Sequence, residues 1–173
     1  MSSRPQPDEY AEYYGRYIDK VPNGDVIAML ESQGDATQKL LASIGEEKAG
    51  YRYEPGKWSI KQVVGHITDS ERVFAYRLLA FARGEKQPLP GFDQDAYMET
   101  ASFDARSLAE LAEGLASTRH ATLTLVRSLD DEAWSRRGIA SDNPVSVRAL
   151  AWIIAGHERH HLNILRERYG IAT

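Results

Sequence analysis

The chain has 173 residues, the size of a single domain that buries roughly two-thirds of the surface its unfolded form exposes. Hydrophobic residues make up 42% and charged residues 27%, which is ordinary globular usage and excludes a disordered chain or a coiled-coil array. The 21 basic and 25 acidic residues are interspersed and give a net charge of −4, which argues against a nucleic-acid-binding protein.

The chain contains no cysteine. This excludes a disulfide framework, a thiol nucleophile and a thiolate metal site, so a transition metal must be held by imidazole and carboxylate groups. The N-terminus lacks the apolar segment of a signal peptide, and the longest apolar run, residues 150–155, is too short to span a bilayer. The sequence therefore predicts a cytoplasmic protein with neither a membrane nor a nucleic acid as partner.

The N-terminal region divides into two predicted parts. Residues 1–9, with two prolines and no periodicity, are expected to form a loose arm. Residues 10–20 carry tyrosines at helical spacing, which predicts a short helix whose aromatic face packs on the main body. We accordingly expect an arm and short helix in residues 1–20 and a helical-bundle domain in residues 21–173.

Two main helices are predicted next. Apolar residues repeat at helical spacing over residues 25–43, with Asp25 as N-cap. The second helix covers residues 60–83, with Ser59 as the N-cap of a capping box and Gly84 as the C-terminal stop. Its predicted buried residues are Ile60, Val63, Val64, Ile67, Phe74, Leu78 and Phe81.

The longest irregular stretch is residues 85–104, with a short helical turn placed after Phe92. A connection of this length is typical of a lid, or of a bundle in which the chain crosses from one end to the other. A third helix is predicted from Asp104 or Ser107 to Ser128.

Residues 129–143 are expected to be irregular, with a helical turn at 132–136 and Trp134 packed into the bundle. The last helix opens at residues 144–147 and runs to Tyr169, with Gly170 as its stop. No segment shows a strand pattern. The predicted fold is all-α: a four-helix bundle with a short extra N-terminal helix and a long connection between helices 2 and 3.

The last helix places histidines in its apolar seam. At 100° per residue, His157 and His161 fall on one arc with the apolar residues of the helix, whereas His160 lies on the flank and Glu158 and Arg159 are predicted to face outward. Two histidines four residues apart can hold one ion, but they can equally be satisfied core residues.

A metal site needs a third ligand from another helix. The candidates are His66, His120, Asp69 and Glu71. His66 lies at the flank of the second helix's apolar stripe, where the adjacent Gly65 lets another element come close. His120 has weaker apolar neighbours and is expected to face solvent. The residue pattern leaves the choice between a metal site and core histidines open.

Three stretches resemble the DinB/YfiT-like metal-binding proteins: KWSIKQVVGHITDSER from Lys57, PLPGFD from Pro88 and AGHERHH from Ala155. The resemblance implies a four-helix bundle with a long connection between its second and third helices. It also implies a divalent metal, nickel or zinc, coordinated by His66, His157 and His161. The family name does not imply DNA binding or polymerase activity.

Members of that family with known activity are transferases or isomerases that use low-molecular-weight thiols, and others are proposed hydrolases. The leading hypothesis is therefore a metal-dependent enzyme that activates a small thiol for transfer to an electrophile. The alternatives are a hydrolase that uses metal-bound hydroxide and a non-enzymatic metal-binding dimer. A homodimer is the expected assembly whichever of these functions the protein has. No catalytic residue is assigned, and Asp69 and Glu71 lie about 160° apart on the helical wheel, so both cannot face His66.

Overall fold

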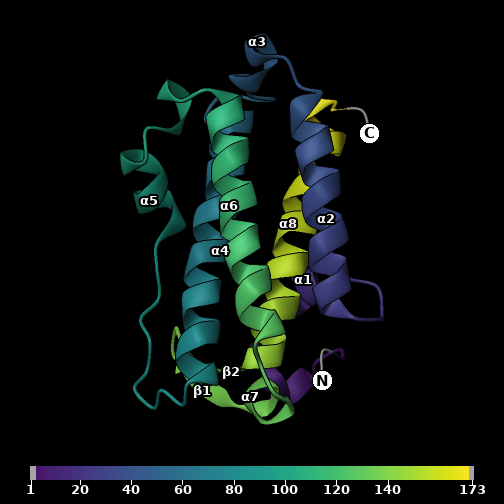
Figure 1. Cartoon of the computed structure of the whole chain (residues 1–173). Coiled ribbons are helices and arrows are strands. Elements are labelled where there is room, and N and C mark those ends of the chain that lie inside the picture. Colours follow the sequence, from purple (N-terminus) through teal and green to yellow (C-terminus); the bar gives the residue numbers. More distant parts are fainter. Residues whose placement is uncertain (1–2, 172–173) are drawn as a thin grey trace.

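The computed structural model describes residues 3–171. Four long helices run along its length, and they are α2 (Val26–Ala42), α4 (Ile60–Ala82), α6 (Leu108–Arg127) and α8 (Val147–Tyr169). Around the bundle, α2 neighbours α6 and α8, and α4 neighbours the same two helices (Figure 1). The predicted four-helix bundle is confirmed.

Each long helix begins at a side-chain cap that the sequence contains. Asp25 accepts a hydrogen bond from the backbone of Ile27, and Ser59 and Ser107 are the N-caps of capping boxes. Ser107, rather than Asp104, thus starts the third long helix. Gly170 ends α8 with φ 63°, a left-handed conformation that glycine adopts without strain.

The long connection after α4 exists because α4 and α6 run in the same direction (Figure 1). The chain leaves α4 at one end of the bundle and must return to the other end before α6 begins. It does so along the outside of the bundle, through α5 (Gln94–Thr100) and the 3₁₀ turn η3 (Phe103–Ala105). The expected helical turn after Phe92 is α5, and Phe103 packs at Gly65, where a Cβ would lie 2.5 Å from its ring.

The prediction that no strands are present is wrong. Strands β1 (Arg137–Ala140) and β2 (Asn143–Ser146) form an antiparallel hairpin, so α8 begins at Val147 and the preceding residues belong to β2. Each strand has only four residues, too few for alternation to be recognised, and the turn residues Ser141 and Asp142 adopt positive φ without being glycine. Trp134, in α7 (Asp131–Ser135), is buried as predicted.

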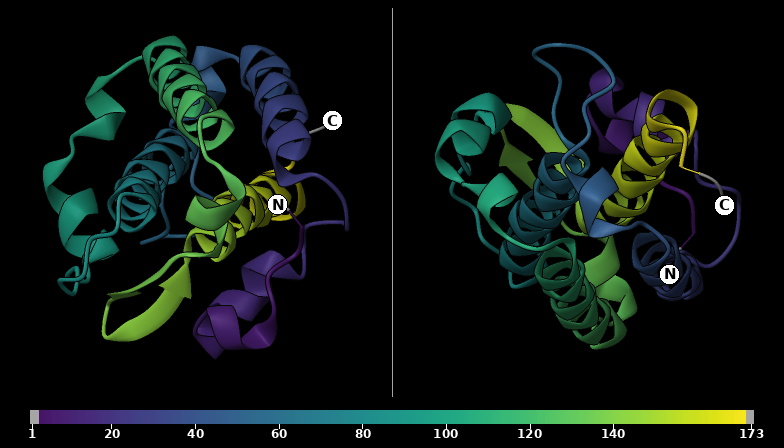
Figure 2. Two further views of the ribbon diagram at one scale, coloured as in Figure 1. Left: turned by 60° about the horizontal axis from the view of Figure 1, so that its bottom comes forward. Right: turned by 90° about the horizontal axis from the view of Figure 1, so that it is seen from above.

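The N-terminal region lies against α8 and the hairpin (Figure 2). Its elements are η1 (Pro7–Glu9), η2 (Glu12–Tyr14) and α1 (Gly15–Ile18). The expected loose arm is therefore ordered within residues 3–9: Glu9 is 2% exposed, accepts a hydrogen bond from Ser146 and pairs with Arg148. Met1 and Ser2 lie outside the described residues.

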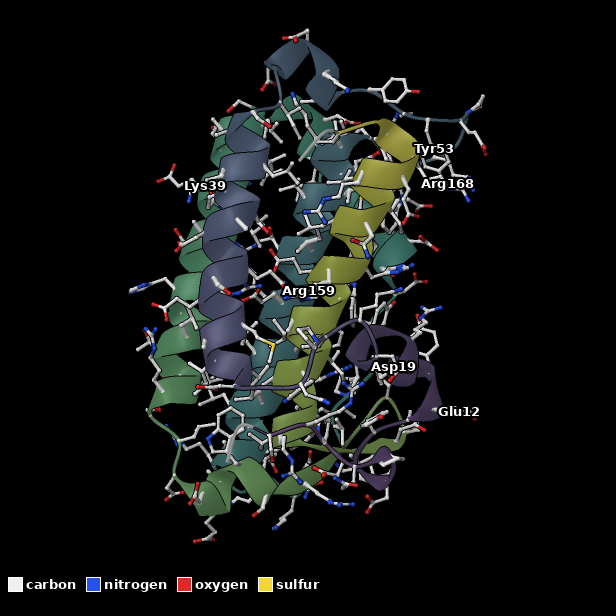
Figure 3. All side chains as sticks on the ribbon, turned by 90° about the vertical axis from the view of Figure 1, so that its right-hand side faces the viewer. Glu12, Asp19, Lys39, Tyr53, Arg159 and Arg168 are labelled. Atoms are coloured by element: carbon white, nitrogen blue, oxygen red, sulfur yellow. The ribbon has the colours of Figure 1, made fainter. Side chains whose placement is uncertain are left out.

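Figure 3 views the bundle along the side formed by α2 and α8, with Lys39 pointing away from α2 and Asp19 at the end of α1 beside α8. A short helix, α3 (Glu46–Ala49), interrupts the loop after α2. No helix within residues 3–171 is long and apolar enough to cross a membrane.

A buried ionic network joins the four long helices. Arg119 of α6 is 4% exposed and pairs with Glu71 of α4 at 2.8 Å and with Glu158 of α8 at 2.7 Å. From α2, Gln33 and Thr37 also donate to Glu158. Glu158 is 1% exposed, so its predicted outward position is wrong. Its side chain faces α2 and α6, and the helical wheel of α8 alone cannot show that these helices supply partners for it.

Candidate metal centre

Three histidines from two helices converge inside the bundle. His66 of α4 and His157 of α8 place their Nε2 atoms 3.1 Å apart, and His161 Nε2 lies 3.2 Å from His157 Nε2. Among residues 3–171 these form the one cluster of at least three potential ligand residues, with ligand atoms within 4.8 Å of one another. The structure thus brings together the three residues that the sequence singled out.

The local sequence accounts for this convergence. His157 and His161 are one helical turn apart on α8, and both face α4. Gly65 lets Phe103 pack directly on α4 beside His66, whose ring lies 4.8 Å from that of Trp58. His66 and His157 are 4% and 5% exposed, whereas His161 is partly exposed.

The environment keeps these imidazoles neutral. Burial, aided by the neighbouring charge of His160, lowers the pKa of His66 to about 4. Burial also holds the pKa of His157 and His161 well below the usual value, and the proximity of the other histidines acts in the same direction. A neutral imidazole is the form that binds a metal. These histidines can therefore bind a metal ion without first releasing a proton from an imidazolium.

The spacing also fits a metal ion. Two nitrogens bound at 2.0–2.1 Å to one tetrahedral ion lie roughly 3.3 Å apart, close to both measured Nε2 separations. In the tautomer that binds a metal, none of the three Nε2 atoms carries a hydrogen, so without an ion they cannot satisfy one another by hydrogen bonds. His66, His157 and His161 could therefore hold one divalent ion and leave part of its coordination sphere open.

A cavity of about 230 Å³ lies between α4 and α8, and two of the three histidines, His66 and His157, line it. The N-terminal segment borders it on one side, and the 85–104 connection and the hairpin turn border it on the other. Its lining residues are Tyr13, Tyr14, Tyr17, His66, Ser70, Phe74, Phe92, Gln94, Ser141 and His157. The predicted aromatic helix face does pack on the main body, but it also forms a cavity wall, which the spacing of the tyrosines does not reveal.

Tyr17 connects the N-terminal segment to the histidines. Its ring contacts His157 and His160 edge-on, with centroids 5.2 and 5.3 Å away, and its hydroxyl accepts a hydrogen bond from Arg16 at 2.8 Å. Burial and the nearby Tyr13 hydroxyl raise the pKa of Tyr17 to about 12. The phenol is therefore a neutral hydrogen-bonding group at physiological pH. His160 contacts the cluster only through its ring, at the rim.

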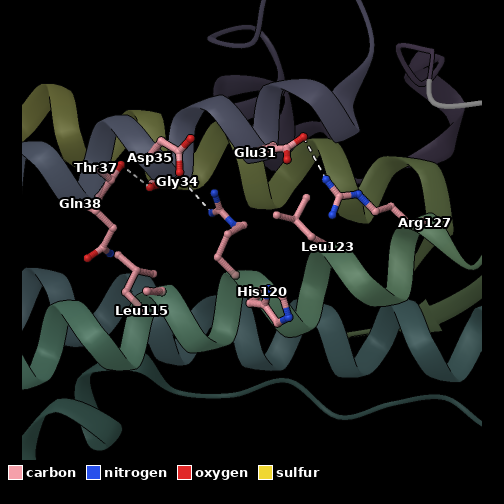
Figure 4. Close-up of a pocket in the computed structure, with 12 residues that line it drawn as sticks. Glu31, Gly34, Asp35, Thr37, Gln38, Leu115, His120, Leu123 and Arg127 are labelled. Atoms are coloured by element: carbon pink, nitrogen blue, oxygen red, sulfur yellow. Dashed lines mark hydrogen bonds and ion pairs between the residues drawn. The ribbon is translucent and has the colours of Figure 1, made fainter.

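The other candidate ligands lie elsewhere. His120 is exposed, as predicted, and borders a separate cavity of about 370 Å³ between α2 and α6 (Figure 4). Asp69 pairs with Arg72, and Glu71 is occupied by Arg119. The cavity in Figure 4 also reaches Arg119, but it contains none of the three clustered histidines.

The chain is similar to known proteins in both sequence and fold. The family model of the DinB superfamily matches residues 29–165. Two proteins named "Putative metal-dependent hydrolase" are similar in sequence. The one from Oceanobacillus iheyensis is 27% identical over 79% of both chains. The one from Geobacillus thermodenitrificans is 29% identical over 83% of this chain and 84% of its own.

Two solved structures share the fold. YfiT from Bacillus subtilis, described as "a probable metal-dependent hydrolase with an unusual four-helix bundle topology", has a TM-score of 0.74 at 18% identity, over 97% of this chain and 94% of its own. A mycothiol-dependent maleylpyruvate isomerase has a TM-score of 0.67 at 14% identity, over 90% of this chain and 64% of its own. At these identities the likeness concerns the fold alone.

Proposed function

Because the chain belongs to the DinB superfamily, we propose that it is a metal-dependent enzyme that activates a small thiol for transfer to an electrophile. The proposed ligands of the divalent metal are His66, His157 and His161. The observation that carries the proposal is the convergence of three neutral imidazoles beside a cavity, in a chain without cysteine. The thiol must then come from a second molecule.

Zinc and nickel are the proposed metals, since both accept imidazole ligands. A bound divalent ion supplies Lewis acidity, which lowers the pKa of a coordinated thiol or water so that its anion exists near neutral pH. The three imidazoles orient and hold that ion. The rings of Phe74 and Tyr17 contact His157 edge-on and shield it from water, and the Tyr17 phenol stays protonated at neutral pH.

The composition of the cavity wall favours a thiol over water as the activated group. Its described lining residues carry hydroxyl, amide, aromatic and imidazole groups, with no carboxylate or lysine to act as general base. A free thiol ionises near pH 8.5 and water at about 15.7, so the thiol needs far less assistance. The Arg16 guanidinium at Tyr17 adds positive charge near an anionic nucleophile.

A metal-dependent hydrolase is the second candidate, favoured by the names of the two sequence relatives. In that case a water molecule would replace the thiol beside the same three histidines. Cytoplasmic location and a homodimer stay predictions. Tyr76 and Leu79 are exposed on α4 beside an apolar groove, which is a candidate dimer surface. Measurement of the molecular mass in solution tests whether the protein dimerises.

Metal content tests the ligand set. Protein purified without a histidine tag should contain about one nickel or zinc per chain, and His157→Ala should remove most of it. His120→Ala, which changes a histidine outside the cluster, is the matched control. A full metal complement in the folded His157 variant would refute the assignment.

Activity assays then separate the two reactions. Metal-loaded protein is supplied with cysteine or glutathione and 1-chloro-2,4-dinitrobenzene, and thioether formation is followed by absorbance. Ester hydrolysis is measured in parallel without thiol. The proposal expects thioether formation that stops on metal removal and returns on readdition. Metal-dependent hydrolysis without any thiol transfer across a panel of thiols would favour the second candidate.

A further inference from the structure

One face of α4 leads from the histidine cluster to a buried arginine. His66, Ser70, Phe74 and Arg77 follow one another at helical spacing, and all four are at most 4% exposed. At 1.5 Å per residue, Ser70 lies about 6 Å along the helix axis from His66, and Arg77 lies roughly 16 Å from His66. The first three of these residues line the cavity beside the metal centre.

Ser70 carries a hydroxyl without a partner. The residue is 1% exposed and its Oγ forms no hydrogen bond. Thr68, two residues earlier, donates to the carbonyl of Val64 at 2.9 Å in the usual way for a helical hydroxyl. Because a buried polar atom is costly when unpaired, the Ser70 hydroxyl is suited to a group that enters the cavity.

Arg77 is a buried cation without an anion. It is 2% exposed, and Nη2 donates to two neutral acceptors, the Pro90 carbonyl at 2.8 Å and Ser141 Oγ at 2.9 Å. No carboxylate within residues 3–171 forms an ion pair with it. Arg119, equally buried, is held between two carboxylates. A guanidinium that is buried without a counter-ion is a site for an anionic group.

The guanidinium lies directly behind the cavity wall. Ser141, which accepts its hydrogen bond, lines the cavity and adopts φ 50° in the hairpin turn. Phe92 lines the cavity as well, and its ring centroid is 5.8 Å from the Arg77 Cζ. Contact between an anion in the cavity and the guanidinium requires Ser141 or Phe92 to move aside, because Arg77 itself lines a neighbouring cavity of about 320 Å³ that shares Phe92 with this one.

We propose that this cavity binds a small carboxylate-bearing molecule, with its carboxylate held by Arg77 and the Ser70 hydroxyl and its other end at the three histidines. This inference rests on the proposed function for the reacting end of the molecule and adds the class of substrate. The volume of about 230 Å³ limits the occupant to a small compound. The planar fork of a guanidinium matches a carboxylate in two parallel hydrogen bonds.

Calorimetry with zinc-loaded protein tests the inference, with succinate as the anionic probe and succinamide as its neutral analogue. Succinate should bind and succinamide should bind at least tenfold more weakly. Arg77→Gln should weaken succinate binding by about ten- to hundredfold, the usual range for a charged hydrogen bond, while zinc content stays at one per chain. Arg83→Gln, which changes an exposed arginine just beyond the end of α4, is the control.

Ser70→Ala keeps the test decisive if the Arg77 variant does not fold. It removes an unpartnered hydroxyl, so stability should be unchanged or higher, while succinate affinity should fall several-fold. Equal succinate binding by wild type and a folded, zinc-loaded Arg77→Gln would overturn the inference, and so would unchanged binding in Ser70→Ala. Arg77-dependent binding without thiol transfer would instead support the carboxylate site and refute only the proposed reaction.

Discussion

Glu158 directly follows His157 in α8, yet their side chains serve different parts of the bundle. His157 Nε2 lies 3.1 Å from His66 Nε2, toward α4. Glu158 Oε2 lies 2.7 Å from Arg119 Nη2, toward α6. One face of α8 thus contributes to the proposed metal centre, and the adjacent face contributes to the buried ionic network. The network therefore fixes the rotation of α8 about its own axis, and with it the direction in which the histidines point.

Arg119→Met should be strongly destabilising. It leaves two carboxylates, Glu71 and Glu158, buried near each other without their cation, and breaking a buried ion pair from one side costs about 3–5 kcal/mol. The free energy of unfolding, measured by urea denaturation, should fall by that amount. Arg127→Met is the control, because its pair with Glu31 is exposed and should contribute about 0–1 kcal/mol. Equal losses in the two variants would contradict this account.

The sequence reveals the bundle because its determinants are local. Helix caps and the period of apolar residues depend on positions close together in the sequence. The structure contains the predicted caps at Asp25, Ser59 and Ser107. The pair His157 and His161 is visible for the same reason, since one helical turn separates them.

What the sequence does not reveal depends on partners far along the chain. Glu158 looks like a surface residue until Arg119, 39 positions away, is placed against it. The unpaired charge of Arg77 is equally invisible, because only the fold shows that no carboxylate within residues 3–171 pairs with it. His66 stands at the edge of its helical stripe, and α8 is what makes that edge an interior position.

The metal-free protein should lose stability as the pH falls below about 6.5. The folded-state pKa of His66 is lowered to about 4 from 6.5, and those of His157 and His161 are also held well below 6.5. Between these values the unfolded chain binds protons that the folded chain does not, so each histidine lowers the free energy of unfolding by up to about 1.4 kcal/mol per pH unit. Above the unfolded-state pKa this stabilising difference is fully retained.

Urea denaturation in the presence of EDTA, at pH values from 7.5 to 4.5, measures this dependence. His157→Leu removes one of the titrating groups and should flatten the profile. His120→Leu changes an exposed histidine and should leave the profile as in the wild type. A wild-type profile with no slope between pH 6.5 and 5 would show that the histidines are not held neutral by burial.

Trp58 should report metal binding through its fluorescence. Its ring lies 4.8 Å from that of His66, so a paramagnetic ion such as Ni²⁺ at the cluster should quench its emission. Trp58→Phe should abolish most of the quenching while the protein still binds one metal per chain. Trp134→Phe, which changes a tryptophan in α7 near the other end of the bundle, should retain it. Quenching that persists in Trp58→Phe and vanishes in Trp134→Phe would place the ion elsewhere.

Gly156→Ala should displace the N-terminal segment from the metal centre. A Cβ at this position would collide with the Tyr17 backbone, which cannot rotate away as a side chain can, so α1 must move from α8. Overpacking of this kind costs about 1–3 kcal/mol, and the exposed Arg16 and Lys20 should become faster sites of tryptic cleavage.

Gly114→Ala is the matched control because this glycine also lies inside a long helix, α6, but a Cβ added there would have no neighbouring side chain within 4 Å. There the added methyl group should raise the free energy of unfolding by about 0.5–1 kcal/mol, since alanine loses less conformational freedom in a helix. The two substitutions therefore have opposite predicted signs in urea denaturation. Stabilisation by both would mean that Tyr17 does not pack closely on α8, and the cavity would then lack its N-terminal wall.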